Sequence, residues 1–190
     1  MKLTRRDLIW IVPSAATAGF FGWFALRAYH IQLGKAGVGE PRWEAGPRLE
    51  VAKVSAMPQP WDFRYFTYPV AIGPTTRQLE SVLLRVPQPQ EGGLTVGEAH
   101  FLALSRICTH QGCTVRYVPD PEVGSIAYNY RSDHPFLGCP CHFGAYDPLQ
   151  AGKAVYGPPR YPLPRLRLEV EAGTLYVTGH ETPLRPAEGG

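Results

Sequence analysis

The sequence is poor in cysteine, in net charge and in internal repeats, and each shortage excludes a class of protein. Four cysteines among 190 residues are too few for a small fold held together by scattered disulfides. A formal net charge of +3, without a stripe of basic and aromatic residues, gives no reason to expect a nucleic-acid partner. Twenty glycines and twenty prolines disfavour long soluble helices and favour short strands joined by turns.

One long hydrophobic run is nevertheless present near the N-terminus. Leu8 to Leu26 gives 19 residues without a charge, about the length of a helix that crosses a bilayer. The run lacks the polar face that a buried amphipathic helix would show. Cations precede it, so the positive-inside rule places the N-terminus in the cytoplasm and the remaining chain outside a prokaryotic cytoplasmic membrane. We therefore predict a single-pass membrane anchor over residues 1–33.

The same segment also resembles an export signal. The stretch TRRDL at 4–8 is similar to a twin-arginine motif, and that pathway carries proteins that fold before export. The small residues at 16–18, Ala-Thr-Ala, offer cleavage as an alternative to retention. The apolar run continues well past this point, through Phe24, so we predict that the anchor is kept.

Composition divides the rest of the chain into three parts. Residues 34–48 are rich in Gly and Pro with little periodicity, which predicts a flexible tether that would let a folded head visit more than one partner. Residues 49–180 form the predicted head. Residues 181–190 have the composition of a disordered tail.

Short apolar segments broken by Pro and Gly predict that the head is rich in β-strands. Leu49–Val54, Val82–Val86 and Phe101–Ile107 are the predicted strands in its first half. Apolar and charged residues alternate over 166–177, with a turn signal at Ala172-Gly173, which predicts a hairpin with one buried face.

The four cysteines lie in two short motifs that also contain histidine, CTHQGC at 108–113 and CPCH at 139–142. A structural zinc site favours cysteines paired as C-x2-C, and neither motif has that spacing. A thioredoxin-like redox pair needs C-x-x-C at a helix start within a βαβ unit, which is also missing. The other histidines are given ordinary roles: His30 and His180 are predicted to be solvated, His134 to be a loop residue, and His100 lies beside a strand start.

A binuclear iron–sulfur site would use every cysteine and histidine of both motifs. A [2Fe–2S] cluster can take two thiolates on one iron and two imidazoles on the other. One cysteine in each loop is then left over, and an oxidising compartment permits a disulfide between them. The predicted export of the head places it in such a compartment.

Both motifs closely resemble the cluster-binding loops of Rieske iron–sulfur proteins, especially the disulfide-containing type found in quinol–cytochrome c oxidoreductases (cytochrome bc complexes). The resemblance extends from the anchor to the C-terminal hairpin. It implies an all-β fold, a Rieske-type antiparallel β-sandwich with a cluster-binding subdomain, preceded by one transmembrane helix. The cluster-binding loops would lie within residues 104–149, and a proline loop that covers the cluster would lie within 156–160.

Carried over residue by residue, the resemblance implies a ligand set and a disulfide. Cys108 and Cys139 would hold the buried iron of one [2Fe–2S] cluster, and His110 and His142 would hold the outer iron. The disulfide would join Cys113 and Cys141. Residues supporting the cluster would be Gly144, Tyr146, Gly157, Pro158 and Pro159, although the last three could also form a plain surface turn.

The resemblance also implies an electron-transfer function. The chain would pass electrons from a quinol to a c-type cytochrome, next to cytochrome b, as a subunit rather than a stand-alone enzyme, and the complex could make it dimeric. Imidazole ligands raise the cluster's potential, and the ring nitrogen that does not bind iron can carry a proton. His142 or His110 would therefore contact the quinol oxygen and accept its proton, while the tether lets the head travel.

The second loop departs from the family pattern at one position that bears on the potential. Many members have C-P-C-H-G-S-x-Y-D, and here Gly144 replaces the serine whose hydroxyl bonds a cluster sulfide, while Tyr146 is kept. Losing a hydrogen bond to sulfur should lower the potential, so we predict a variant matched to a low-potential quinol such as menaquinol. The alternative is that Gly144 only relieves crowding from Phe143.

Other interpretations stay open at this point. The 25 residues of 114–138 are more than compact family members have, and their aromatic residues Tyr128, Tyr130 and Phe136, with His134, could form a lid or a docking face. The chain could also be the Rieske subunit of another exported oxidoreductase, such as arsenite oxidase. A third alternative is an exported binding module stapled by zinc.

Overall fold

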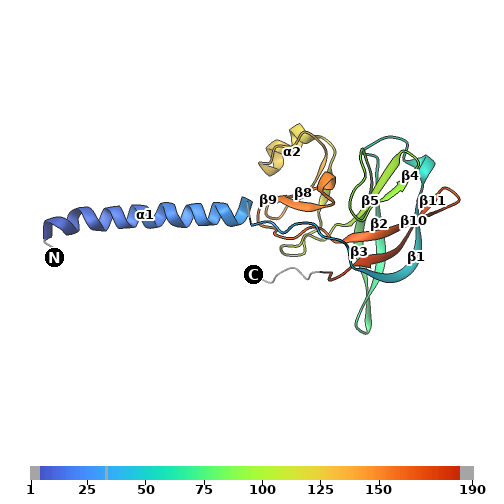
Figure 1. The fold of residues 1–190 in the computed structure, drawn as a ribbon, viewed down its shortest axis with the longest axis horizontal. Helices are drawn as coiled ribbons and strands as arrows, with labels where there is room; N and C mark the ends of the chain where they lie inside the picture. The colour runs from blue at the N-terminus through green and yellow to red at the C-terminus, as the bar shows by residue number, and fades with distance from the viewer. Residues whose placement is uncertain (1–4, 33, 185–190) are drawn as a thin grey trace.

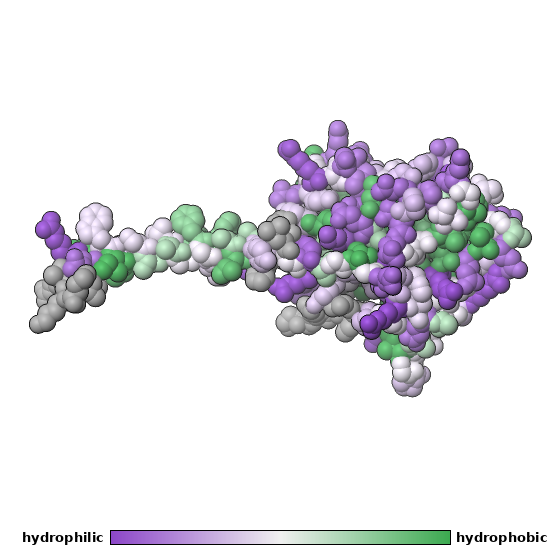
Figure 2. Space-filling model, viewed as in Figure 1, coloured by the Kyte–Doolittle hydropathy of each residue, from purple (hydrophilic) through white to green (hydrophobic). Residues whose placement is uncertain are grey.

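The computed structural model describes residues 5–32 and 34–184, and it shows a long N-terminal helix joined to a β-rich head (Figure 1). Helix α1, Arg5–Gln32, contains the apolar segment Ile9–Tyr29, whose length and composition suit a membrane span. None of that apolar window is buried against the rest of the chain. Figure 2 shows hydrophobic side chains along this helix, whereas the visible face of the head is largely hydrophilic. The predicted anchor helix is therefore present.

The large sheet of the head has seven antiparallel strands, in the order β1–β11–β10–β5–β3–β2 with β4 beside β5. These strands are β1 (Trp43–Lys53), β2 (Phe63–Ile72), β3 (Thr75–Val86), β4 (Leu94–Val96), β5 (Ala99–Ser105), β10 (Arg165–Glu171) and β11 (Thr174–Glu181). The two outer strands of that order, β1 and β2, also contact each other, so the sheet curls until it is nearly closed. Curling in this way leaves little exposed strand edge.

A smaller sheet of four strands, in the order β6–β7–β8–β9, packs against one face of the large sheet. Its strands are β6 (Arg116–Val118), β7 (Phe136–Cys139), β8 (Gly144–Asp147) and β9 (Lys153–Tyr156). Two 3-10 turns, Val54–Ala56 and Pro148–Gln150, complete the head with helix α2 (Pro121–Tyr128). Successive residues of a strand face opposite sides, and β3 is buried on both: Val82 and Leu84 face the small sheet, while Leu83 faces the interior of the large one.

Local chemistry explains why α2 interrupts the small sheet. The Asp120 side chain caps the helix by accepting hydrogen bonds from the backbone N–H groups of Glu122 and Val123, and Pro121 occupies the first turn. Asn129 ends the helix in the left-handed conformation, which asparagine tolerates better than most residues. The 114–138 segment is therefore an ordered strand–helix–strand unit.

The all-β prediction and its hairpin are confirmed. Strands β10 and β11 form the hairpin, and its turn residues Ala172 and Gly173 both have positive φ, at 47° and 76°. Predicted strands at 82–86 and 101–107 fall on β3 and β5, although β5 ends at Ser105 because Ile107 forms only an isolated bridge with Thr114.

The structure corrects the predicted boundaries at both ends of the head. Strand β1 begins at Trp43 rather than Leu49, because the backbone of residues 43–45 pairs with residues 179–181 of β11. The last six residues of the predicted tether are therefore part of the sheet. The predicted tail begins too early, since Glu181 ends β11, and its residues 185–190 lie outside the described part of the chain.

The prediction that His180 is solvated is wrong. His180 lies in β11 and is 4% exposed, with its Nε2 3.8 Å from a carboxylate oxygen of Glu44 on the neighbouring strand. Burial lowers the pKa of His180, and the nearby Glu44 offsets only part of this effect. The error arose because the strand continues past the point where apolar alternation stops.

Candidate metal centre

Two backbone turns bring the cysteine–histidine motifs together. The first motif follows β5 and folds back on itself: the N–H of Cys108 donates to the carbonyl of Cys113, and the N–H of Gly112 donates to the carbonyl of Cys108. The second motif is the connection between β7 and β8, where Cys139 pairs with Gly144. The first motif therefore lies in the connection from the large sheet to the small one, and the second lies in a loop of the small sheet; functional residues often lie in such loops.

The four cysteines separate into a bonded pair and a free pair. Cys113 and Cys141 form a disulfide that joins the two loops, as the resemblance implies. Cys108 and Cys139 are free thiols, 2% and 1% exposed. The sulfur atoms of Cys139 and the disulfide lie within 4.8 Å of one another. The loops are thus joined covalently beside two buried thiols, one from each loop.

The two histidines lie on the solvent side of these thiols. The rings of His110 and His142 are 4.9 Å apart at their centroids and nearly perpendicular. His142 is exposed and His110 is half-buried. The Nδ1 atom of His110 is buried and lacks a hydrogen-bond partner among the described residues. A buried, unsatisfied ring nitrogen is costly for a protein and is the atom that a metal ion would satisfy.

The donor set fits a binuclear iron–sulfur cluster. Two soft thiols lie inside and two imidazoles lie outside, which is the division between the two irons that a cluster with mixed ligands requires. The structure therefore brings together Cys108, His110, Cys139 and His142, the four residues that the sequence predicted as ligands.

A family model for the Rieske [2Fe–2S] domain matches residues 74–167. The matched segment runs from the start of β3 into β10 and contains both motifs. The chain carries a Rieske [2Fe–2S] domain. Such a domain binds a [2Fe–2S] cluster, so the alternative of a zinc-stapled module is wrong.

Two relatives show the range of complexes in which similar domains occur. A protein named as a Rieske subunit of the respiratory nitrate reductase of Haloferax mediterranei is 38% identical over 82 residues, covering 43% of this chain and 31% of the relative. The iron–sulfur subunit of the menaquinol:cytochrome c reductase of Bacillus subtilis is 40% identical over 78 residues, covering 40% of each. The chain thus matches less than half the length of either relative.

The soluble domain of Rieske protein II from Sulfolobus acidocaldarius has a similar fold. The TM-score is 0.51 at 23% sequence identity, and the alignment covers 70% of this chain and 78% of that one. This likeness concerns the fold, and it agrees with the two-sheet architecture described above.

Hydrogen bonds in the Rieske domain converge on the sulfur of Cys108. The Tyr146 hydroxyl donates to Cys108 Sγ at 3.2 Å and accepts from the backbone N–H of Thr109 at 3.0 Å. The thiol of Cys139 and the Tyr146 hydroxyl stabilise negative charge on that sulfur, lowering the pKa of Cys108 to about 5, although burial opposes this. The same interaction raises the pKa of Cys139, because its thiol is the donor in the pair.

The family pattern of the second loop indicated a role for Tyr146, but no sequence motif indicated a role for Thr109. The Thr109 hydroxyl lies 3.1 Å from the Tyr146 hydroxyl and donates to the carbonyl of Tyr161 at 2.8 Å. Thr109 is buried, and its backbone N–H and hydroxyl groups hold the Tyr146 hydroxyl in the orientation that faces Cys108. Its place inside CTHQGC was the signal that could have pointed to it.

The predicted proline loop lies against the second motif. A Cβ atom at Gly144 would lie 2.6 Å from Cγ of Pro159, and one at Gly157 would lie 2.8 Å from the Gly144 Cα. Gly157 also has a φ of 75°, which favours glycine. Crowding at Gly144 thus comes from Pro159, and the predicted neighbour Phe143 points into solvent with 53% exposure.

The 114–138 segment contributes to an apolar cleft beside His142. The cleft has a volume of 430 Å³ and is lined by Ile126, Ala127, Tyr128, Asn129, His142, Phe143, Tyr156, Gly157 and Pro158. Ile126 is 88% exposed, and Phe143 holds a positive φ of 55°, a conformation that is strained for a bulky residue. Behind them, the rings of Tyr128, Tyr130 and Phe136 pack edge to face.

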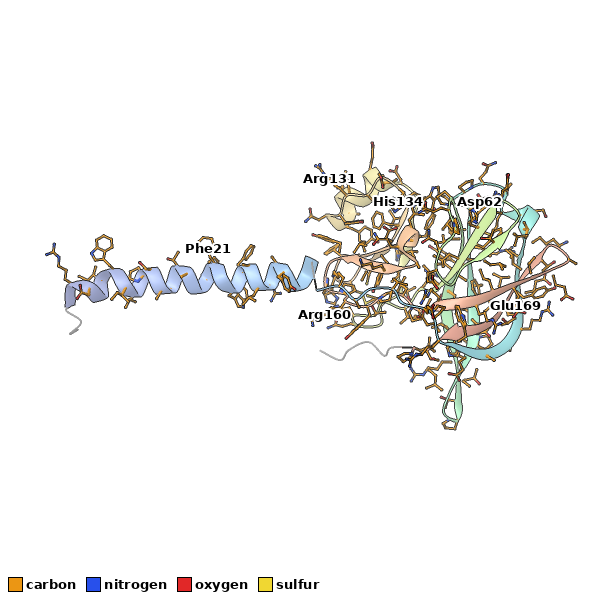
Figure 3. The ribbon with its side chains drawn as sticks, in the orientation of Figure 1. Phe21, Asp62, Arg131, His134, Arg160 and Glu169 are labelled. Atoms are coloured by element: carbon orange, nitrogen blue, oxygen red, sulfur yellow. A yellow bond between two sulfur atoms is a disulfide. The ribbon has the colours of Figure 1, made fainter. Side chains whose placement is uncertain are left out.

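His134 is not near the histidine pair and instead forms an ion-paired bridge. Its Nδ1 lies 2.5 Å from Asp133, and its Nε2 lies 2.9 Å from the buried carboxylate of Asp147. Its ring stacks on Trp61, which follows the first 3-10 turn (Figure 3 labels His134). The prediction of an ordinary loop histidine therefore missed a link between the small sheet and the large one.

Proposed function

We propose that this chain is the electron-transfer subunit of a membrane-bound quinol–cytochrome c oxidoreductase of the cytochrome bc type. The observation that carries the proposal is the place of His142. It is exposed, adjoins the buried thiols and borders an apolar cleft. That cleft includes Gly157, whose carbonyl is contacted by Lys35, three residues after the end of the apolar helix. An apolar electron donor from the membrane would meet His142 there.

The proposed ligands follow from burial. Cys108 and Cys139 would hold the inner iron, and His110 and His142 the outer iron, because the thiols are enclosed and the imidazoles face solvent. When bound, the cluster supplies a one-electron acceptor whose potential is raised by neutral imidazole ligands. The disulfide between Cys113 and Cys141 keeps the two ligand loops in register.

Within this proposal, His142 binds and deprotonates the quinol. Its exposed ring can accept a hydrogen bond from a quinol hydroxyl and then hold the proton on the nitrogen that does not face the thiols. His110 is less accessible and contributes mainly as a ligand. The apolar side chains of Ile126 and Phe143 would exclude water around that contact.

The proposed partners are cytochrome b, from which the quinol is presented, and a c-type cytochrome that takes the electron. Support comes from the relative named as part of a menaquinol:cytochrome c reductase. Gly144 in place of serine removes one hydrogen-bond donor to the cluster, which favours a low potential and a quinol such as menaquinol. The cations before the apolar helix favour a cytoplasmic N-terminus and a head outside the membrane.

Purification of the tagged full chain from its native membranes tests this function. We expect b-type and c-type haem to copurify and a quinol analogue to alter the paramagnetic resonance spectrum of the reduced cluster. His142→Gln should abolish quinol oxidation. A cluster-bearing chain that leaves the membrane without detergent and copurifies with a molybdenum enzyme would instead support the second candidate, a Rieske subunit of another exported oxidoreductase. The nitrate reductase relative is the reason to retain that candidate.

A further inference from the structure

The chain contacts its own proline loop directly after it leaves the membrane helix. Helix α1 ends at Gln32, and the Nζ atom of Lys35 donates to the carbonyl oxygens of Gly157 and Pro159, the latter at 2.6 Å. The backbone N–H of Ala36 donates to the carbonyl of Arg160 at 2.7 Å. Figure 3 shows Arg160 close to the point where the helix meets the head.

The opposite side of the same loop packs against the second cluster motif. Gly157 and Pro159 approach Gly144 so closely that neither glycine has room for a Cβ atom. The loop thus has Lys35 on one side and the Cys139–Gly144 turn on the other. The two residues whose carbonyls Lys35 contacts are therefore the same residues that pack against Gly144.

A second contact continues the attachment along the tether. Arg165, 1% exposed, pairs with Glu181 and also donates from Nη2 to the carbonyl of Gly39 at 2.7 Å. From Lys35 to Gly39 the tether therefore lies against the head. The contact at Gly39 is made by a buried arginine that is also paired with Glu181, so we expect it to stay closed. The contact at Lys35 is made by a half-buried side chain, which can open more easily.

The chemistry at Lys35 suits a contact that can open. In the described part of the chain, its Nζ contacts carbonyl oxygens and forms no ion pair with a carboxylate. Burial, together with the nearby charge of Arg160, lowers the pKa of Lys35 to about 8. Because water can replace carbonyl oxygens as acceptors, opening leaves no charge unpaired in the interior.

We propose that Lys35 is a positioning residue: its ammonium group latches the proline loop to the membrane-proximal tether and fixes the orientation of the head relative to its anchor. With the latch closed, the head keeps one orientation. With the latch open, the tether is held from Gly39 onward and the head is free to turn. This role of Lys35 does not depend on the proposed quinol function.

The test uses the full chain in lipid nanodiscs and in oriented membranes. Lys35→Met keeps the aliphatic stem and removes the donors, and Lys53→Met is the matched control, because Lys53 is an exposed lysine at the far end of β1. We expect amide exchange in residues 34–38 to become about tenfold faster in Lys35→Met. The resonance of the reduced cluster should show a wider spread of orientations. Lys53→Met should match the wild type in both measurements.

Three outcomes would overturn the latch. The first is that amide exchange and cluster orientation in Lys35→Met equal those of the wild type. The second is that Lys53→Met changes both measurements as much as Lys35→Met does. The third is that Lys35→Met loses its cluster spectrum, which would show that Lys35 maintains the cluster loops. Lys35→Arg keeps the donors and should restore slow exchange. Because none of these measurements uses quinol, a failed latch and a failed quinol assignment remain distinguishable.

Discussion

At the scale of single residues, close approach of two loops explains the glycine at 144. Sequence comparison attributed the missing serine to a lower cluster potential, with relief of crowding as the alternative. The structure supplies a source of crowding that the sequence did not indicate, the ring of Pro159. A single substitution to serine would therefore change the crowding and the proposed hydrogen bond together.

Two variants at 144 separate the hydrogen bond from the crowding. Gly144→Ala and Gly144→Ser add the same Cβ atom against Pro159, and only serine adds a hydroxyl donor. A net hydrogen bond of about 1 kcal/mol corresponds to about 40 mV for a one-electron couple. We expect the midpoint potential of Gly144→Ser to exceed that of Gly144→Ala by about this amount, measured by redox titration of the cluster signal. Equal midpoints would show that the glycine serves packing alone.

Tyr146 offers the converse change. Tyr146→Phe keeps the buried ring and removes the hydroxyl that donates to Cys108 Sγ. Because that donor stabilises negative charge on the sulfur, we expect the midpoint to fall by about 40 mV, from a contribution of about 1 kcal/mol. Tyr130→Phe, which changes a tyrosine of the neighbouring aromatic group, is the control and should leave the midpoint unchanged. A rise in Tyr146→Phe would contradict the assigned direction of the hydrogen bond.

At the scale of elements, the connection between α2 and β7 is held by a charged bridge. His134 lies between Asp133 and Asp147, and Asp147 also accepts hydrogen bonds from Leu149 and Gln150. Trp61 covers the ring. The bridge therefore joins the end of β8 to the loop that leads into the second cysteine motif.

The bridge predicts a loss of stability as the pH rises. Burial lowers the pKa of His134, but hydrogen bonds to Asp147 and Asp133 outweigh it, so the pKa is raised overall. Charged His134 thus stabilises the folded chain fully below its unfolded pKa of about 6.5, and this contribution disappears as the pH rises through the folded pKa. We expect the thermal midpoint to fall across that range.

The control for this bridge is His134→Gln, whose amide N–H group can still donate to a carboxylate and which does not titrate. Its thermal midpoint should be lower than that of the wild type at pH 6 and should change less between pH 6 and 8. Parallel pH profiles for the two proteins would show that His134 does not carry the effect.

At the scale of the whole molecule, helix α1 does not pack its apolar window against the head, and the segment after the helix holds the two together. The tether contacts the head through Lys35, Ala36, Gly39 and Arg42. We expect a truncated chain starting at Gly34 to be soluble and to keep the visible and resonance spectra of the cluster. A second truncation starting at Trp43 lacks the contacts of Lys35 and Gly39 and should unfold at a lower temperature. Equal stability of the two truncations would show that the tether does not support the head.

The cysteine–histidine site was easier to predict from the sequence than the contacts between distant segments that surround it. Ligand chemistry requires particular residue types at short spacing, so CTHQGC and CPCH indicated a cysteine–histidine site, and the family resemblance of these motifs assigned the ligands and the disulfide. Contacts between distant segments leave no such local pattern. Lys35 on the proline loop, Glu181 on Arg165 and His134 on Asp147 join residues 13 to 124 positions apart. The early start of β1 has the same cause, since its pairing partner is the last strand.

The facing glycines at 144 and 157 also constrain how this protein could have evolved. A side chain at either position meets the backbone or proline ring of the opposite loop. A serine at 144 therefore requires the ring of Pro159 to shift, so its acquisition would favour a compensating change in the 156–160 loop. The midpoint potential of the cluster and the packing of the two loops would then change together. We expect related sequences to differ at 144, 157 and 159 as a group rather than one position at a time.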